Sequence, residues 1–228
     1  MGSCKKCIVK EFTTLNTLSS EELEEVSHHK NEMCFKRGDV IFREGSLLNG
    51  VFCIKQGKCK LTKLSPNGKD QIVKFIKDGD MSGHRSVLSE EPVNLSAVAL
   101  EDMQVCFIPK SDIIKSIHAN KYFSKSMFKV ICHELKDAHS KLTNMAQKTV
   151  RERLAEALLF LDETFGEDAE GYLNIRLSRE EIANVIGTST ESAIRSLSEM
   201  NKEQLILLFG KKIKLLKKKR LKTMGVGF

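Results

Sequence analysis

Glu191 and Arg195 are the residues of this chain whose types and spacing suggest the most specific chemistry. On a helix, residues four apart lie on the same face. An arginine there can donate two hydrogen bonds to guanine, and a glutamate can accept one from the amino group of cytosine, so the pair complements a G·C base pair. Two such residues also form ordinary surface ion pairs, and the pair alone leaves both interpretations open.

Cysteines form a second chemical pattern. Cys4 and Cys7 are a C-x-x-C pair, and Cys106 stands apart within an apolar run. Closely spaced thiolates can bind metals or form a disulfide switch, whereas isolated cysteines in apolar runs are usually small core residues. A redox or metal role and plain unreactive thiols are both open for these three. The core interpretation is preferred for Cys53, Cys59 and Cys132.

No catalytic pattern accompanies these residues. The sequence lacks paired carboxylates, a Ser-His-Asp set, a phosphate-binding loop and a metal-hydrolase motif, and its histidines lack the spacing of ligands on one helix face. The chain is therefore predicted not to be an enzyme. It also lacks an apolar run of about 18 residues and the apolar core of a secretory signal, so we expect no membrane association and a cytoplasmic location.

Two short helices joined by a glycine turn are predicted to position the glutamate–arginine pair. Ser178 and Glu181 form a capping box that begins the first helix, Gly187 ends it, and the second helix covers residues 190–200. This is the helix-turn-helix pattern, whose second helix enters the major groove with its first residues at the base edges. The expected DNA-contacting residues of this helix are Ser189, Thr190, Glu191, Ser192 and Arg195.

A basic hairpin follows. Residues 209–215 turn at Gly210 and alternate lysines with apolar residues, which predicts a wing whose exposed lysines, Lys211 and Lys212, contact DNA. Residues 201–228 hold nine lysines and arginines against a single acid, a net charge of +8, whereas the whole chain carries +7. A localised basic end favours a polyanionic partner, here double-stranded DNA.

Residues 35–110 show a different pattern, in which short β-rich runs alternate with glycines. Regular short strands with turns between them favour an antiparallel sandwich or barrel. The sequence Pro-Asn-Gly at 66–68 predicts a hairpin turn, and residues 14–32 are expected to form one or two helices. The predicted strands are 40–42, 51–54, 59–64, 71–75, 95–100 and 104–108.

After Pro109 the pattern becomes helical, and one apolar stripe dominates it. Its residues recur at spacings of 3 and 4 between charged neighbours. A stripe this narrow favours a two-stranded coiled coil between two copies of the chain, with packing onto the chain's own core as the alternative. A further amphipathic helix is expected over 150–164. The predicted dimer residues are Phe128, Ile131, Leu135, Ala138, Leu142 and Met145.

Together these motifs resemble the Crp/Fnr family over nearly the whole chain. The resemblance implies an α+β fold, with an N-terminal antiparallel β-barrel of the jelly-roll, cyclic-nucleotide-binding type, a long dimerisation helix and a C-terminal winged helix-turn-helix. The matching stretches are 38–45, 54–57, 79–83, 177–195 and 210–213. The expected domains are a sensor domain over 1–120, a dimerisation helix over 121–148 and a DNA-binding domain over 149–228.

The resemblance also implies a function. Members of the family are homodimeric transcription activators that bind an inverted repeat and recruit RNA polymerase. Glu191 and Arg195 fall on the family's base-contacting glutamate and arginine, which predicts TGA-like half-sites, whereas Thr190 stands where cyclic-AMP receptor proteins often have arginine. The alternative is a regulatory ligand-binding module that does not bind DNA, which would leave the basic hairpin and the helix-turn-helix without a role.

The effector pocket of this family uses a Gly-Glu pair for ribose and an Arg-Ser pair for phosphate. This chain has Gly83-His84 and Leu95-Ser96 at the corresponding positions, so it lacks the charged groups of that pocket. The resemblance therefore predicts a degenerate pocket without tight cyclic-AMP binding. His84 or Arg85 could bind a different anion, but a surface or structural role is preferred.

The cysteines also have a counterpart in the family. Members that resemble the oxygen sensor Fnr bind a [4Fe–4S] cluster through N-terminal cysteines and one barrel cysteine. Cys4, Cys7 and Cys106 match three of those four ligand positions, and Thr13 stands at the remaining one. Because the cluster needs four suitable donors, a cluster, another redox or metal role and unreactive thiols are all left open.

Overall fold

The computed structural model describes residues 13–65, 68 and 70–226. The chain divides into two compact units, Met1–Lys136 and Asp137–Phe228. Cys4 and Cys7 lie outside the described residues, as does most of the predicted turn at 66–68.

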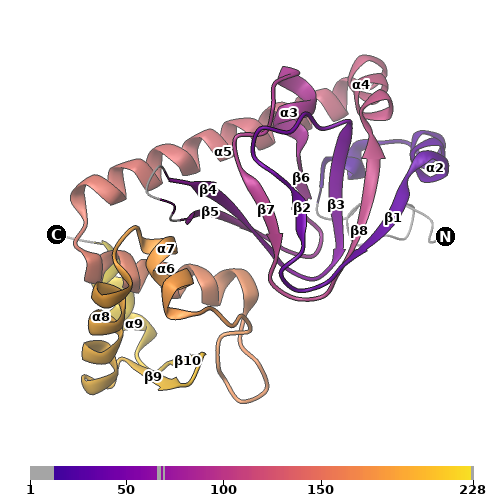
Figure 1. Cartoon of the computed structure of the whole chain (residues 1–228). Coiled ribbons are helices and arrows are strands. Elements are labelled where there is room, and N and C mark those ends of the chain that lie inside the picture. The colour runs from indigo at the N-terminus through magenta and orange to yellow at the C-terminus, as the bar shows by residue number, and fades with distance from the viewer. Residues whose placement is uncertain (1–12, 66–67, 69, 227–228) are drawn as a thin grey trace. The chain divides into compact units, whose positions relative to one another are not determined.

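The first unit is built on two four-stranded antiparallel sheets that form a roll (Figure 1). Their strand orders are β1-β8-β3-β6 and β2-β7-β4-β5. This confirms the predicted antiparallel, jelly-roll-like architecture. The strands are β1 (Asn31–Phe35), β2 (Val40–Phe42), β3 (Gly50–Gln56), β4 (Cys59–Leu64), β5 (Asp70–Ile76), β6 (Met81–Ser82), β7 (Ser96–Ala99) and β8 (Met103–Pro109).

Strand β3 shows how the roll is held together. Its side chains alternate between two apolar clusters, because successive residues of a strand point to opposite faces of the sheet. Val51 and Cys53 belong to the cluster beneath the helices, whereas Phe52 and Ile54 belong to the cluster between the two sheets. A strand buried on both faces needs a continuous apolar run, which is why this strand was predictable from the sequence.

The helices of the first unit contribute to the cluster beneath the sheet. Leu23, Ile113, Phe123 and Met127 are buried there. The helical elements are η2 (Thr14–Thr17), α2 (Ser20–His29), α3 (His84–Ser89), α4 (Lys110–Ala119) and the first half of α5 (Lys121–Gln147).

Three elements of the first unit differ from the sequence-based expectation. Strand β1 lies partly in a segment expected to be helical, and neither β6 nor α3 was predicted. The first four residues of β1 are exposed, and the strand pairs only with β8 in its sheet. This exposed edge strand does not alternate apolar and polar residues, and its partners on β8 lie 68 to 76 residues away, so local patterns do not predict the pairing.

The second unit consists of the end of α5 and a small helical domain with a two-stranded hairpin. Its core contains the buried residues Leu154, Leu158, Ile182, Leu197 and Met200. Capping boxes begin two of its helices, one of them the predicted Ser178–Glu181 box. The elements are α6 (Val150–Phe165), α7 (Arg179–Ile186), α8 (Thr190–Lys202), β9 (Ile206–Phe209), β10 (Lys212–Leu215) and α9 (Lys218–Val226).

None of the helices in the described ranges combines the length and apolar character needed to cross a membrane.

Candidate nucleic-acid interface

Helices α7 and α8 form the predicted helix-turn-helix, and its turn is closely held. Gly187 ends α7 in the left-handed conformation, with φ of 64°, where glycine is favoured. Arg153 of α6 braces the turn, because its Nε donates to the carbonyl of Ile186 at 2.7 Å and its Nη1 to that of Lys148 at 2.6 Å. The guanidinium of Arg153 thus connects the turn with the segment between α5 and α6.

The first turn of α8 has a side-chain cap. Ser189 is the N-cap, and its Oγ accepts a hydrogen bond from the amide of Ser192 at 3.2 Å. The same Oγ lies 3.2 Å from Oγ of Ser192. These two serines, both predicted to contact DNA, therefore also shape the start of the helix.

Helix α8 has one buried and one exposed face. Glu191 and Arg195 lie on the exposed face as predicted, and Thr190 is partly exposed beside them. Ile194, which sequence analysis missed, lies on the same face with 44% of its surface exposed. The opposite face packs into the core through Ala193, Ser196, Leu197 and Met200.

Ile194 adds an aliphatic group to this exposed face. Its spacing of three from Glu191 was visible in the sequence, but an isoleucine in a helix is normally assigned to the core. Exposed between an acid and a base, an aliphatic side chain can contact the 5-methyl group of thymine, which is the apolar feature of the major groove.

The wing is the hairpin of β9 and β10. Phe209 and Lys212 are paired across its turn, and Gly210 adopts a φ of 56°. Arg179, at the start of α7, donates through Nη2 to the Gly210 carbonyl at 2.9 Å. This bond holds the tip of the wing to the helix-turn-helix and leaves Lys211 exposed beside it.

The two remaining lysines of the wing are engaged within the unit. Lys212 donates to a carboxylate oxygen of Glu170 at 2.7 Å, and Lys214 donates to the Glu170 carbonyl at 2.8 Å. Both ammonium groups also lie over the ring of Tyr172, at 5.1 and 5.7 Å from its centroid. The two predicted wing contacts, Lys211 and Lys212, are therefore not equivalent.

The basic C-terminal segment is likewise only partly neutralised. Lys218 pairs with Asp162 at 2.7 Å and with Glu167 at 3.1 Å. The basic residues that flank Lys218 are exposed, and they are Lys217, Lys219, Arg220 and Lys222.

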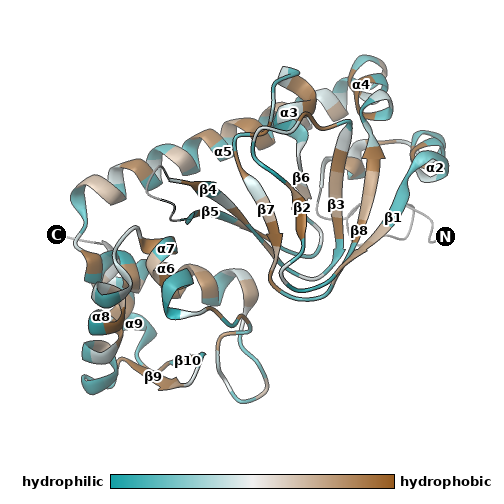
Figure 2. Cartoon of the chain, viewed as in Figure 1, coloured by the Kyte–Doolittle hydropathy of each residue, from teal (hydrophilic) through white to brown (hydrophobic). Residues whose placement is uncertain are grey.

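Helix α5 carries the predicted dimer stripe. Brown, apolar segments recur along this helix in Figure 2. All six predicted residues are exposed in the single chain, with Phe128 and Leu142 the most exposed at 68% and 71%. Cys132, on the same helix, is exposed too, so its assignment to the core is wrong, whereas Cys53 and Cys59 are buried as expected. A sequence pattern could not distinguish a core from an outward face on this helix.

The residues at the predicted effector positions already make contacts within the first unit. Gly83 precedes α3, and His84 is 5% exposed and hydrogen-bonded to Glu134. Arg85 pairs with Glu91 and donates to a backbone carbonyl. The remaining two positions are also occupied, since Leu95 packs against the core and Ser96 accepts a hydrogen bond from the Glu44 amide at 3.0 Å.

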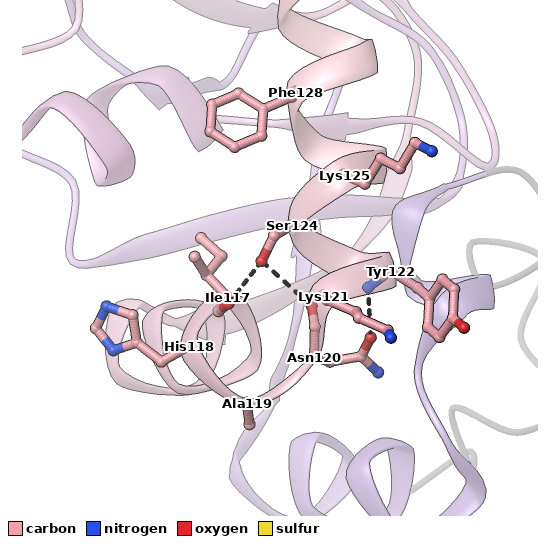
Figure 3. Close-up of a pocket in the computed structure, with 9 residues that line it drawn as sticks. All are labelled: Ile117, His118, Ala119, Asn120, Lys121, Tyr122, Ser124, Lys125 and Phe128. Carbon is pink, nitrogen blue, oxygen red and sulfur yellow. Dashed lines mark hydrogen bonds between the residues drawn. The ribbon is translucent and has the colours of Figure 1, made fainter.

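A pocket of about 770 Å³ lies elsewhere, at the junction of α4 and α5 (Figure 3). Ser124 of α5 links the two helices, because its hydroxyl donates a hydrogen bond to the carbonyl of Ile117 in α4 at 2.6 Å. Phe128, the first residue of the dimer stripe, lines the same pocket. It is therefore not the pocket that the family resemblance predicted.

The structure places Cys106 in the apolar cluster beneath the helices, directly opposite Cys53 of β3. Thr13 caps η2, with its side chain accepting from the Leu15 amide. Across the described ranges, no three histidine, cysteine or acidic side chains gather in a way that could hold a metal. Of the three cysteines that match cluster ligands, only Cys106 lies among the described residues. The described residues alone therefore do not provide the four ligands of a [4Fe–4S] cluster.

The β-roll, the long helix and the winged helix-turn-helix together define a DNA-binding transcription regulator with a sensor-type domain. Residues 32–120 match the cyclic nucleotide-binding domain family, and residues 152–224 match the Crp-like helix-turn-helix domain family. The chain belongs to the Crp/Fnr family of transcription regulators.

Individual relatives agree with this assignment. The chain is 27% identical over 218 residues to the transcriptional activator protein Anr of Pseudomonas protegens, which covers 93% of this chain and 88% of that protein. It is 25% identical over 224 residues to the nitrogen fixation regulation protein FixK of Bradyrhizobium diazoefficiens, covering 97% and 93%. The solved structure of FixK2 from Bradyrhizobium japonicum has the same fold, with a TM-score of 0.76 at 24% identity over 86% of this chain and 96% of that one.

Proposed function

We propose that this protein acts as a homodimer that binds an inverted repeat, with α8 of each copy in the major groove. The observation that carries the proposal is the exposed face of α8, where Glu191, Ile194 and Arg195 lie together on a helix whose other face is buried. Recognition helices of this type read half-sites whose centres are about 34 Å apart, one turn of DNA. We propose the same domain limits as the sequence predicted: a sensor domain over 1–120, a dimerisation helix over 121–148 and a DNA-binding domain over 149–228.

Dimerisation is proposed to occur along α5. Five of the six stripe residues are large apolar side chains that the single chain leaves exposed. An exposed apolar stripe at heptad spacing gains stability when a second helix covers it. The dimer would then present two copies of α8, as an inverted repeat requires.

Phosphate contacts are proposed for Lys211 of the wing and for the exposed basic residues beyond it. Such contacts supply affinity without sequence information, and that affinity falls steeply with salt. Because the proposed partners are DNA and RNA polymerase, the site of action is the bacterial cytoplasm. Relatives of this chain are named transcriptional activators, which supports activation through recruitment of RNA polymerase.

The signal is a separate question from DNA binding. One relative, from Mycobacterium tuberculosis, is named a cAMP-activated regulator. At the corresponding positions of this chain, however, His84 is bonded to Glu134 of α5, and Arg85 and Ser96 are bonded within the roll. We therefore propose that the chain does not bind cyclic AMP tightly. An anaerobic purification with an absorption spectrum and an iron count tests the cluster hypothesis for Cys4, Cys7 and Cys106.

A selection from a randomised duplex library, followed by Arg195→Ala, tests the proposed function. We expect the wild-type protein to select an inverted repeat, and the variant to lose about 1–3 kcal/mol on that site with relaxed specificity at one base pair. Lys202→Ala, at the far end of the exposed side of α8, is the matched control and should keep the specificity. Failure to select any duplex would favour the ligand-binding module, and equal losses on selected and scrambled DNA would make Arg195 a phosphate contact.

A further inference from the structure

A charge network joins the roll to α5. Glu134, in the middle of α5, accepts from Nζ of Lys74 on β5 at 2.6 Å and from Nε2 of His84 on α3 at 3.0 Å. The two donors bind different oxygens of the same carboxylate. Figure 1 shows α3 and β5 as separate elements of the roll, so the carboxylate connects α5 with two elements whose donors precede it by 50 and 60 residues.

The network occupies a particular face of α5. Phe123 and Met127 are buried against the roll, and Val130 and Glu134 continue the same face at spacings of three and four. The exposed dimer stripe, with Leu135 next in sequence to Glu134, runs along a neighbouring face, roughly a quarter-turn around the helix axis. Three apolar residues of the roll-facing stripe are therefore followed by a carboxylate, at a position where simple packing would favour another apolar side chain.

The carboxylate is held in its charged form. Burial raises the pKa of Glu134, but the hydrogen bonds and charges of His84 and Lys74 outweigh this and lower it to about 2. Because Glu134 is ionised, Nε2 of His84 must carry the hydrogen and donate it. Nδ1 of His84 is buried, and no hydrogen-bond partner for it exists among the described residues, so Glu134 is the group that orients the ring.

The neighbouring cation does not share in this network. Arg85 follows His84 in sequence but turns to Glu91 and to the Pro92 carbonyl. The donor site facing α5 thus consists of His84 and Lys74, and its acceptor comes from α5 itself.

We propose that Glu134 is a built-in anionic ligand of the roll. Its carboxylate fills the donor site of Lys74 and His84, so that α5 is anchored without a small anionic effector, and an external anion could enter only by displacing it. The inference rests on the proposed function, since it concerns how the roll controls the helix that carries the dimer stripe. It accounts for a sensor-type domain whose effector positions are bonded internally.

Glu134→Gln and Glu134→Ala in the full-length protein test this inference. We expect both to weaken binding to the selected duplex, without added ligand, by about 5- to 150-fold, the range typical of coupling between two sites. Hydrogen exchange in residues 121–136 should become faster in both variants. In Glu134→Ala, formate in place of chloride at equal ionic strength should restore affinity, because a small carboxylate can occupy the vacated donor site.

Two comparisons make the result decisive. Glu91→Gln removes the exposed partner of Arg85 and should change neither property. Lys74→Met, which leaves the histidine pair in place, should act in the same direction as Glu134→Gln and less than additively with it. Circular dichroism would show whether the Glu134 variants fold. If they do not, the effect of Lys74→Met on duplex binding and hydrogen exchange decides the inference.

The inference is overturned if Glu134→Gln keeps wild-type affinity and exchange rates, or if formate gives Glu134→Ala no more recovery than chloride does. Hydrogen exchange in residues 121–136 reports on the anchor even without DNA. A wild-type protein that binds no duplex would therefore refute the proposed function while leaving this measurement to decide the inference.

Discussion

The pairing of Lys212 with Glu170 leads to a quantitative prediction about salt dependence. Each phosphate that a lysine neutralises on B-DNA releases counterions and steepens the plot of log affinity against log salt by about 0.9. Lys212 is only 23% exposed and its ammonium already faces a carboxylate at 2.7 Å, whereas Lys211 is exposed. We therefore expect Lys211→Ala to reduce the slope by about 0.9, and Lys212→Ala to change it much less.

Removing the carboxylate of Glu170 should make Lys212 contribute to the salt dependence as Lys211 does. In Glu170→Gln, Lys212 becomes available to DNA, and the slope should steepen by about 0.9. Adding Lys212→Ala to that variant should abolish the gain. The cost of releasing Lys212 is small, because a partly exposed ion pair contributes only about 0.2–1 kcal/mol.

Fluorescence anisotropy with a labelled duplex across a potassium chloride series measures these slopes. Scrambled DNA serves as the control, since phosphate contacts should affect it as much as the selected site. If Lys212→Ala and Lys211→Ala reduce the slope equally in the wild-type background, the Glu170 pair opens in the complex, and the distinction between the two lysines is refuted.

Three further predictions concern the dimer, base recognition and acid stability. Leu135→Asp should yield monomers in sedimentation velocity, because it buries a charge in the apolar stripe; an unchanged dimer would place the interface elsewhere. Replacing thymine by uracil in the half-site should weaken the wild-type protein, and Ile194→Ala should be insensitive to that replacement if the methyl contact exists. The pKa of Glu134 is lowered in the folded state from 4.5 to about 2. The stability that its charge contributes is therefore fully present above pH 4.5, and it is lost as the pH falls from 4.5 toward 2. Chemical denaturation across acidic pH should show this loss in the wild type and a smaller one in Glu134→Gln.

The helix-turn-helix was the part of the site most accessible from the sequence. Ser178, Glu181 and Gly187 are caps whose effects act within one turn of a helix, and the structure confirms each of them. The same local logic placed Glu191 and Arg195 on one face. It missed Ile194, because apolar residues at helical spacing are assigned to a core unless the partner elements are known.

The roll was predictable in class but not in all its elements. Strands β3 and β4 carry continuous or regularly spaced apolar residues, and both were expected. Strand β1 was not expected, because its extended conformation depends on hydrogen bonding to β8. Local sequence cannot encode a partner that the chain brings alongside only on folding.

The sequence by itself therefore determined the features that depend on near neighbours: the caps, the helical and strand periods, the basic end and the family to which they belong. The tertiary structure alone decided which charges meet. Glu134 reaches Lys74 and His84, and Glu170 reaches Lys212, over separations of 42 to 60 residues. Electrostatic pairing depends on distance and burial in space, which are properties of the packed chain and not of its order.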